Sequence, residues 1–113
     1  MDKSTQPTMP DGQATDTFQV INALGVHARV ASMLVLCANR YKSEIRLQRE
    51  GEDGDAPEVN GKSIMGVLML AAPKGSVIRV RTIGDDAAEA LKAIGELFKQ
   101  GFYEGVGKPG GGV

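Results

Sequence analysis

The sequence predicts an α/β (α+β) protein, an open-faced two-layer β-α-β-β-α-β-α sandwich with three helices on one face of a four-stranded antiparallel sheet. The first observation behind this prediction is the spacing of apolar residues along the chain. Segments in which every second residue is apolar, as in a strand, alternate with segments in which apolar residues recur every three or four positions, as in a helix. The second is that the predicted strands carry Arg and Gln on their other face, which is typical of a sheet with one face in water.

The two ends of the chain differ in composition from its middle. Residues 1–16 contain only Met and Ala as apolar residues, and residues 105–113 are rich in glycine. Neither segment can bury enough apolar surface to offset the entropy of ordering it. We therefore predict a disordered leader over 1–16, one folded domain over 17–104 and a flexible tail over 105–113.

The first half of the domain is predicted to contain three strands and a helix. The helix lacks Gly and Pro and is too long for a typical strand, and the strand after it alternates strictly, with Ile45 and Leu47 on one side. An acidic turn that contains glycine separates the last two strands. In chain order these elements are the strand 17–22, the helix 28–41, the strand 43–49, the turn 50–55 and the strand 57–60.

The second half is predicted to add a helix, a strand and a final helix. Ser63 stands where the N-cap of a helix over 62–72 is expected. Residues 73–75 end that helix, and an alternating strand follows over 76–83. The last helix opens at Asp85 and Asp86, Gly101 and Gly105 are its expected stops, and its apolar stripe consists of Leu91, Ile94, Phe98 and Phe102.

Composition excludes several classes of function. The formal net charge of −1 argues against a nucleic-acid partner. A single cysteine and a single histidine exclude an internal disulfide and leave no metal cluster of nitrogen and sulfur ligands. The polar segment 1–16 lacks the apolar core of a signal peptide, and no apolar run reaches the length of a membrane span, so we expect neither feature. We expect a cytoplasmic protein without a metal or cofactor of its own.

His27 is the candidate reactive residue. Gly25 permits a tight turn before it, the helix that starts just after it presents unpaired N–H groups, and Arg29 adds a cation. These features make an anion site with a nucleophilic imidazole at its mouth. A transient phosphohistidine fits this arrangement better than hydrolysis, because no carboxylate or serine is placed to use His27 as a general base. The simpler interpretation is a polar loop histidine.

Three stretches carry a resemblance to a known family: "GVHARVA" (25–31), "NGKSIMGVLML" (60–70) and "KGSVIRVRTIGDDAAEAL" (74–91). Together they resemble HPr, the histidine-containing phosphocarrier of the bacterial phosphoenolpyruvate-dependent sugar phosphotransferase system. The resemblance covers residues 17–104. It implies the same open-faced fold, and a carrier with a covalent phosphohistidine rather than a free-standing enzyme.

The resemblance also implies site residues and partners. His27 matches the histidine that phospho-enzyme I phosphorylates on its Nδ1 (pros) nitrogen. The phosphorylated histidine then donates the phosphoryl group to an A-type subunit or domain of enzyme II. Arg29 matches the arginine that contacts the phosphoryl group. Ser63 matches a serine that a kinase/phosphorylase modifies in many members, although a plain N-cap serine is an equal alternative. The implied docking patch beside that serine consists of Ile64, Met65 and Leu68.

The chain departs from the family pattern at three positions. Val30 stands where the family usually has proline, and valine can adopt the same backbone angle. Met33 and Leu36 are apolar at helix positions that are commonly polar in the family. Either they are ordinary surface variation, or they extend the docking face beside His27.

Two functions follow from these observations. The first is a monomeric phosphocarrier that accepts a phosphoryl group on His27 and passes it on toward sugar transport. The alternative is a regulatory interaction module of the same fold, switched by phosphorylation at His27 or Ser63 and not feeding sugar transport. Onward transfer from His27 to an acceptor discriminates between them.

Overall fold

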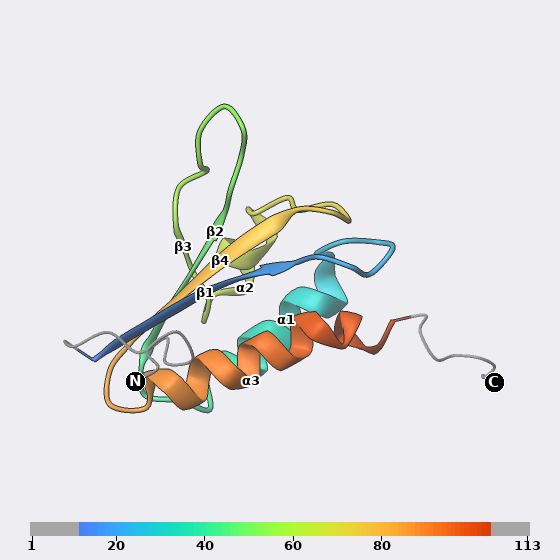
Figure 1. Cartoon of the computed structure of the whole chain (residues 1–113). Helices are drawn as coiled ribbons and strands as arrows, with labels where there is room; N and C mark the ends of the chain where they lie inside the picture. The colour runs from blue at the N-terminus through green and yellow to red at the C-terminus, as the bar shows by residue number, and fades with distance from the viewer. Residues whose placement is uncertain (1–11, 105–113) are drawn as a thin grey trace, which may run out of the picture.

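The computed structural model of the chain describes residues 12–104. Four strands and three helices follow one another in the predicted β-α-β-β-α-β-α order, with a short 3₁₀ turn at the end. Figure 1 shows α1 and α3 below the sheet. The elements are β1 (Gln13–Gln19), α1 (Ala28–Ala38), β2 (Glu44–Arg49), β3 (Val59–Asn60), α2 (Ile64–Leu68), β4 (Val77–Ile83), α3 (Ala87–Lys99) and the 3₁₀ turn Gly101–Tyr103.

The four strands form one antiparallel sheet in the order β1-β4-β2-β3. β4 lies in the middle, where Val80 pairs with Asp16 of β1 and with Leu47 of β2. The side chains of Ile45, Leu47, Ile78 and Val80 are buried on the face toward the helices. The predicted fold class and sheet are therefore confirmed.

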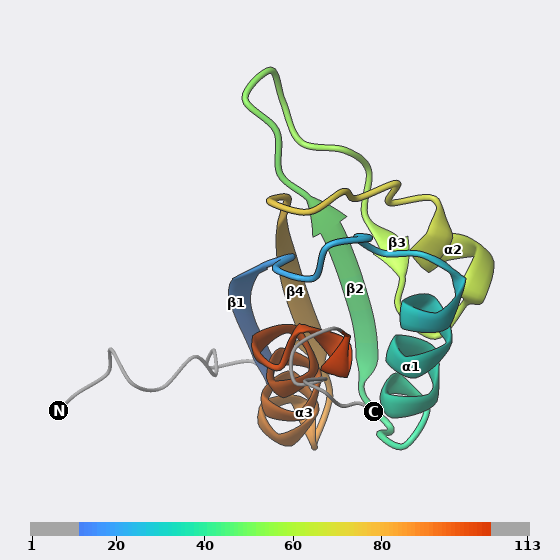
Figure 2. The same cartoon turned by 90° about the vertical axis from the view of Figure 1, so that its right-hand side faces the viewer.

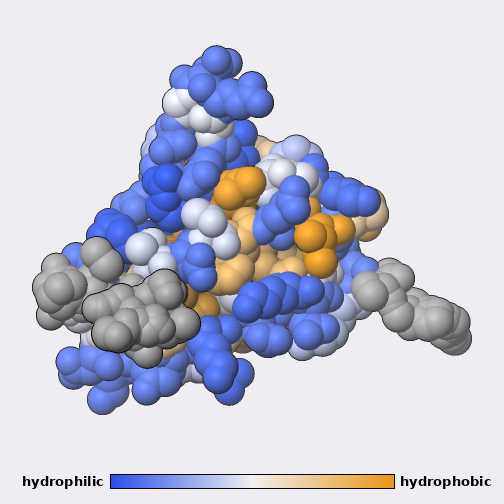
Figure 3. Space-filling model, viewed as in Figure 1, coloured by the Kyte–Doolittle hydropathy of each residue, from blue (hydrophilic) through white to orange (hydrophobic). Residues whose placement is uncertain are grey.

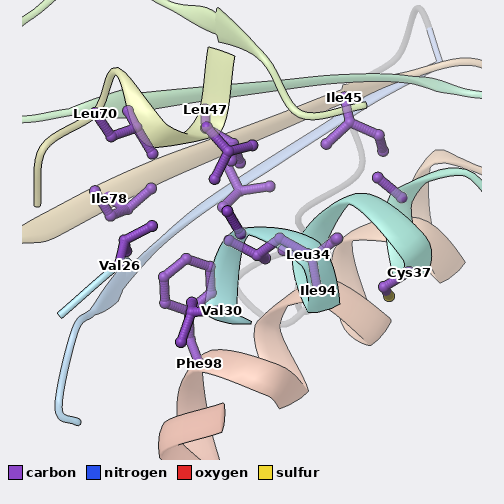
Figure 4. Close-up of a cluster of buried hydrophobic side chains, with 14 of the residues drawn as sticks. Val26, Val30, Leu34, Cys37, Ile45, Leu47, Leu70, Ile78, Ile94 and Phe98 are labelled. Carbon is purple, nitrogen blue, oxygen red and sulfur yellow. The ribbon is translucent and has the colours of Figure 1, made fainter. Parts of the chain in front are cut away.

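The hydrophobic core fills the space between the sheet and the helices. α1 contributes Val30 and Leu34, and α3 contributes Ile94 and Phe98, all of them fully or almost fully buried (Figure 4). Phe98 stacks on Phe18 of β1 with 5.6 Å between ring centroids. Figure 2 shows α1 and α3 side by side beneath the sheet, with α2 next to α1.

The opposite face of the sheet is polar, as the alternating strands predict. Arg79 of β4 contacts Glu50 at 2.6 Å and Gln48 at 2.8 Å, and the neighbouring Arg81 contacts Glu58 at 2.8 Å. Glu50 and Glu58 lie at the two ends of the long β2–β3 connection, which projects from the molecule as a hydrophilic loop (Figure 3). Ion pairs thus fill the face that the helices leave open.

The predicted bounds differ from the structure at several elements, and the differences are largest in β1, in α2 and at the end of α3. β1 spans Gln13–Gln19 rather than 17–22, so residues 13–16 of the expected disordered leader are ordered by pairing with β4. The rest of the leader, and the tail over 105–113, lie outside the described residues. α2 has five residues instead of the eleven expected over 62–72, because Ala71 takes a left-handed conformation (φ 47°) and Pro73 follows.

The third correction concerns the end of α3. Gly101 stops the helix as predicted, with φ +59°, but Phe102 is not on a helical stripe. Phe102 also has positive φ, and its fully buried ring packs edge-on against Phe98 at 5.0 Å. The buried ring fixes a tight turn after α3, and this turn directs Glu104 toward the start of α1.

Candidate phosphoryl-acceptor site

His27 occupies the N-cap of α1, at the end of the β1–α1 loop. Its backbone is extended (φ −109°, ψ −174°), and its Nδ1 accepts a hydrogen bond from the backbone N–H of Arg29 at 3.3 Å. The side chain is 32% exposed, so a protein partner can reach the ring. Nδ1 therefore faces the unpaired N–H groups and the positive end of an 11-residue helix.

Gly25 allows the loop to approach the core closely, as predicted. Its φ of +71° favours glycine, and a Cβ atom there would lie 2.5 Å from the carbonyl oxygen of Ala72. The next residue, Val26, donates its N–H to the same carbonyl at 2.9 Å. The loop that presents His27 is thus held against the segment that follows α2.

Glu104 joins the site from the far end of the chain. Its Oε2 contacts His27 Nε2 and accepts a hydrogen bond from Arg29 Nη2 at 2.8 Å. Its Oε1 accepts from the Nδ2 of the buried Asn22 at 2.8 Å, and Asn22 also donates to Gly25 O. The carboxylate therefore ties the histidine and the arginine to the loop that carries them.

The carboxylate determines which ring nitrogen of His27 carries the proton in this contact. An ionised carboxylate can only accept, so Nε2 must carry the proton in this contact. Nδ1 then keeps its lone pair, in agreement with its acceptance of the Arg29 N–H. The neutral tautomer that results is nucleophilic at Nδ1, beside the helix N-terminus.

The pKa of Glu104 is lowered to about 2 from an ordinary 4.5. Partial burial alone would raise this pKa, but hydrogen bonds from Asn22, His27 and Arg29 outweigh it and favour the ionised form. The side chain is only 13% exposed, which limits screening by solvent. Glu104 is therefore a fixed negative charge at any physiological pH.

Replacing Glu104 by glutamine is expected to change how stability depends on pH. A depressed pKa contributes stability that is fully present above about 4.5 and is lost as pH falls toward 2. At pH 6 the free energy of unfolding of Glu104→Gln should be lower than wild type by roughly 1–3 kcal/mol, and this difference should close near pH 2. Urea unfolding at pH 6, 4 and 2 measures it. Glu52→Gln, in the exposed loop, is the matched control, and a pH-independent difference would contradict the assignment.

Ser63 is the N-cap of α2, as predicted, and its Oγ accepts from the Gly66 N–H at 3.1 Å. Beside it, Ile64 is 42% exposed and Met65 70% exposed, whereas Leu68 is half-buried against the core. In the docking patch that the family resemblance implies, Ile64 and Met65 are therefore accessible at the surface, whereas Leu68 is only partly accessible. α2 packs on α1, the helix that His27 caps, and Figure 2 shows the two helices next to each other.

Met33 and Leu36 differ in burial, since Met33 is half-buried against the core and Leu36 lies on the exposed side of α1. Arg29 Nη1 contacts the Met33 sulfur at 3.1 Å, so Met33 is joined to the site directly. Leu36 is 71% exposed. Val30, which stands at the position of the family proline, is fully buried in the core instead of taking part in the site.

Within residues 12–104, no group of three or more His, Cys, Asp or Glu side chains is placed to hold a metal ion. The same part of the chain contains no helix that is both long and apolar enough to cross a membrane.

Sequence reasoning pointed to Gly25, His27 and Arg29 but missed Glu104 and Asn22. Its expectation that no carboxylate is placed beside His27 is wrong, because Glu104 contacts the imidazole. Glu104 is 77 residues away from His27 and next to a glycine-rich tail, so no local pattern marks it. Asn22 lies at the end of the expected first strand, where a buried polar side chain is not anticipated. Their roles depend on the turn after α3.

The fold and the site together define a small open-faced sandwich that presents a single imidazole at a helix N-terminus, an arrangement typical of a phosphoryl carrier domain. A sequence profile described as "PTS HPr component phosphorylation site" matches residues 14–100. The phosphocarrier protein HPr of Neisseria meningitidis is 43% identical over 89 residues, which cover 79% of this chain and 94% of that protein. HPr of Xylella fastidiosa is 46% identical over 85 residues, covering 75% and 90%.

Solved structures agree with these sequence matches. HPr-C-His from Thermoanaerobacter tengcongensis superposes with a TM-score of 0.70 at 36% identity, over 80% of this chain and 96% of that one. HPr from Bacillus anthracis gives 0.68 at 37% identity, over 76% and 96%. The chain belongs to the HPr family, and it is a phosphocarrier of the phosphotransferase system.

Proposed function

We propose that His27 accepts the phosphoryl group from phospho-enzyme I on Nδ1 and passes it to an A-type subunit or domain of enzyme II. The observation that carries this proposal is the pairing of His27 Nε2 with Glu104, because it leaves Nδ1 as the unprotonated nitrogen at the helix N-terminus. The homologues support the carrier and not the regulatory module considered as an alternative.

In the transfer step, the lone pair of Nδ1 attacks the phosphorus atom while the bond from phosphorus to the donor's histidine breaks. The backbone N–H groups at the start of α1 and the guanidinium of Arg29 then face the transferred oxygens and stabilise their charge. The ring gains positive charge as the new bond forms, and the Glu104 carboxylate at Nε2 offsets it. Positioning and charge neutralisation are what a phosphoryl transfer chiefly needs from the protein.

The carrier is proposed to act as a monomer. We propose that these phosphoryl transfers take place in the cytoplasm, where phosphoenolpyruvate is available to enzyme I. We propose no cofactor for the carrier itself.

The test is to incubate the protein with enzyme I, Mg²⁺ and phosphoenolpyruvate. We expect one phosphoryl group per chain, labile in acid and stable in base, with the ¹⁵N and ³¹P NMR signals of Nδ1-phosphohistidine. Addition of an A-type enzyme II domain should remove the group from this protein. Phosphorylation on Nε2, or none at all, would contradict the proposed site.

We further propose that Ser63 is a regulatory position for a serine kinase/phosphorylase. A phosphate there would stand at a helix N-cap, where an anion is tolerated. It would also stand beside the exposed Ile64 and Met65, where its desolvation opposes docking.

Ser63→Asp is expected to keep the fold and to raise the apparent Michaelis constant of enzyme I for this protein at least threefold, about 0.7 kcal/mol. The physical reason is a charge at the rim of an apolar contact. Steady-state phosphorylation assays measure the constant, and Ser63→Asn is the control because it keeps a neutral cap. Equal Michaelis constants for Ser63→Asp and Ser63→Asn would show that Ser63 acts only as a helix cap.

A further inference from the structure

Asn22 is a buried polar side chain in the β1–α1 loop, which leads to His27. It is only 3% exposed. Its Nδ2 donates one hydrogen bond to the backbone carbonyl of Gly25 and another to Oε1 of Glu104, each at 2.8 Å. The first acceptor belongs to the loop itself, and the second follows the 3₁₀ turn after α3. The amide therefore joins two segments that are 82 residues apart in the chain.

The partners of this amide fix its orientation. A backbone carbonyl and an ionised carboxylate can only accept hydrogen bonds, so the two N–H donors of Asn22 must face them. Its oxygen, Oδ1, is buried and has no hydrogen-bond partner among the residues that the structure describes. A buried polar atom without a partner lowers the stability of a protein. The fold thus retains a polar side chain here although one of its two polar atoms stays unpaired.

Backbone contacts already hold the β1–α1 loop in place. The N–H of Gly25 donates to the backbone carbonyl of Asn22 at 3.2 Å, and the N–H of Val26 donates to the carbonyl of Ala72 at 2.9 Å. Neither contact involves the Asn22 side chain. What this side chain adds to a loop that is already held is its contact with the Glu104 carboxylate.

Glu104 serves His27 and Arg29 with one oxygen while Asn22 holds the other. Oε2 contacts Nε2 of His27 and accepts from Nη2 of Arg29 at 2.8 Å, and Oε1 faces the asparagine amide. A carboxylate that is held at one oxygen cannot rotate freely, so its second oxygen stays at the imidazole. Without that anchor, the carboxylate could follow the half-exposed guanidinium of Arg29 away from the ring.

We propose that Asn22 is a positioning residue for phosphoryl transfer and that it acts on His27 through Glu104. The proposal rests on the function proposed for His27 and adds a residue that does not touch the phosphoryl group. By holding the carboxylate, Asn22 keeps a negative charge beside the ring while the ring becomes positive during transfer. Asparagine suits this position because it is the shortest side chain whose end carries two N–H donors on one atom.

The first test is Asn22→Asp, which keeps the shape of the side chain and replaces its donors by an oxygen. Two carboxylates would then face each other, and Glu104 should move away from His27. We expect the rate of phosphoryl transfer in single turnovers with phospho-enzyme I to fall about tenfold. Asn39→Asp, the same change at the exposed C-cap of α1, is the control and should transfer at the wild-type rate. Equal rates for the two variants would overturn the proposal.

The second test is the NMR signal of the proton on Nε2 of His27, which a purely structural role of Asn22 would not move. In ¹⁵N-labelled wild type with a neutral ring, the contact with Glu104 should shift this signal downfield and slow its exchange with water. In Asn22→Asp the signal should move upfield or disappear through exchange, whereas Asn39→Asp should keep it. Far-UV circular dichroism checks that each variant is folded. A slower transfer with an unchanged signal would overturn the proposal.

The third test asks whether Asn22 acts through Glu104. Asn22→Ala alone should slow transfer about tenfold. In a Glu104→Gln background it should slow transfer by less than about a factor of two, because the carboxylate that it positions is already gone. A full additional loss in the double variant would overturn the proposal, since Asn22 would then act on the loop. Failure of wild type to be phosphorylated on Nδ1 would instead contradict the proposed function, so the two failures are distinguishable.

Discussion

His27→Ala is expected to abolish phosphorylation by enzyme I and phosphoenolpyruvate. His27 is the only histidine in the chain, so no other side chain can carry an acid-labile phosphoramidate on an imidazole. Intact-mass spectrometry after incubation at neutral pH measures the loss, which should reach the detection limit. Ser63→Ala should be labelled like wild type.

The substitution also removes the N-cap acceptor for the Arg29 N–H and the partner of Glu104. Loss of the cap is expected to cost about 1 kcal/mol, which leaves the domain folded. His27→Asn is the matched variant, because asparagine restores a cap acceptor but provides no imidazole. Labelling of either variant would show that another residue accepts the phosphoryl group.

Arg29→Ala is expected to slow phosphoryl transfer about 100-fold, which corresponds to about 2.7 kcal/mol of transition-state stabilisation. The guanidinium lies at the helix start with Glu104 and Phe102 O as partners, within reach of a group on Nδ1. Because its effect is on charge that develops during transfer, the loss should be mainly in the turnover number. Rapid-quench measurements with phospho-enzyme I give the rate.

Arg46→Ala is the control for Arg29, since Arg46 is a similarly exposed arginine on the opposite face of the sheet. Arg29→Lys should recover part of the rate, because lysine keeps the charge but loses the planar set of donors. If Arg29→Ala left the rate of phosphoryl transfer unchanged, both from phospho-enzyme I and to the enzyme II acceptor, the guanidinium would have no role in the site. A change confined to the Michaelis constant would assign it to docking instead.

The reactive part of the site was predictable because its signals are local. Gly25, His27 and Arg29 lie within five residues, and a turn glycine before a helix start predicts both the backbone geometry and the anion site. The structure shows the same arrangement, with Gly25 at positive φ and His27 at the N-cap. Ser63 was predictable as a cap for the same reason.

The charge that orients His27 was not predictable. Glu104 reaches the ring only because Gly101, Phe102 and Tyr103 form a left-handed turn, anchored by the burial of Phe102 against Phe98. The helical spacing of Phe102 predicted a continued helix, which would have carried Glu104 elsewhere. Packing of one aromatic ring outweighed the local helical pattern.

The sequence by itself determined the order of the elements, the face of each strand that is buried and the position of His27 at the start of a helix. These follow from hydrophobic period and turn chemistry, which act over a few residues. Only the tertiary structure decided the start of β1, since pairing with β4 orders residues 13–16 despite their polar composition. It also decided the proton position on His27, because this depends on a contact between segments far apart in the chain.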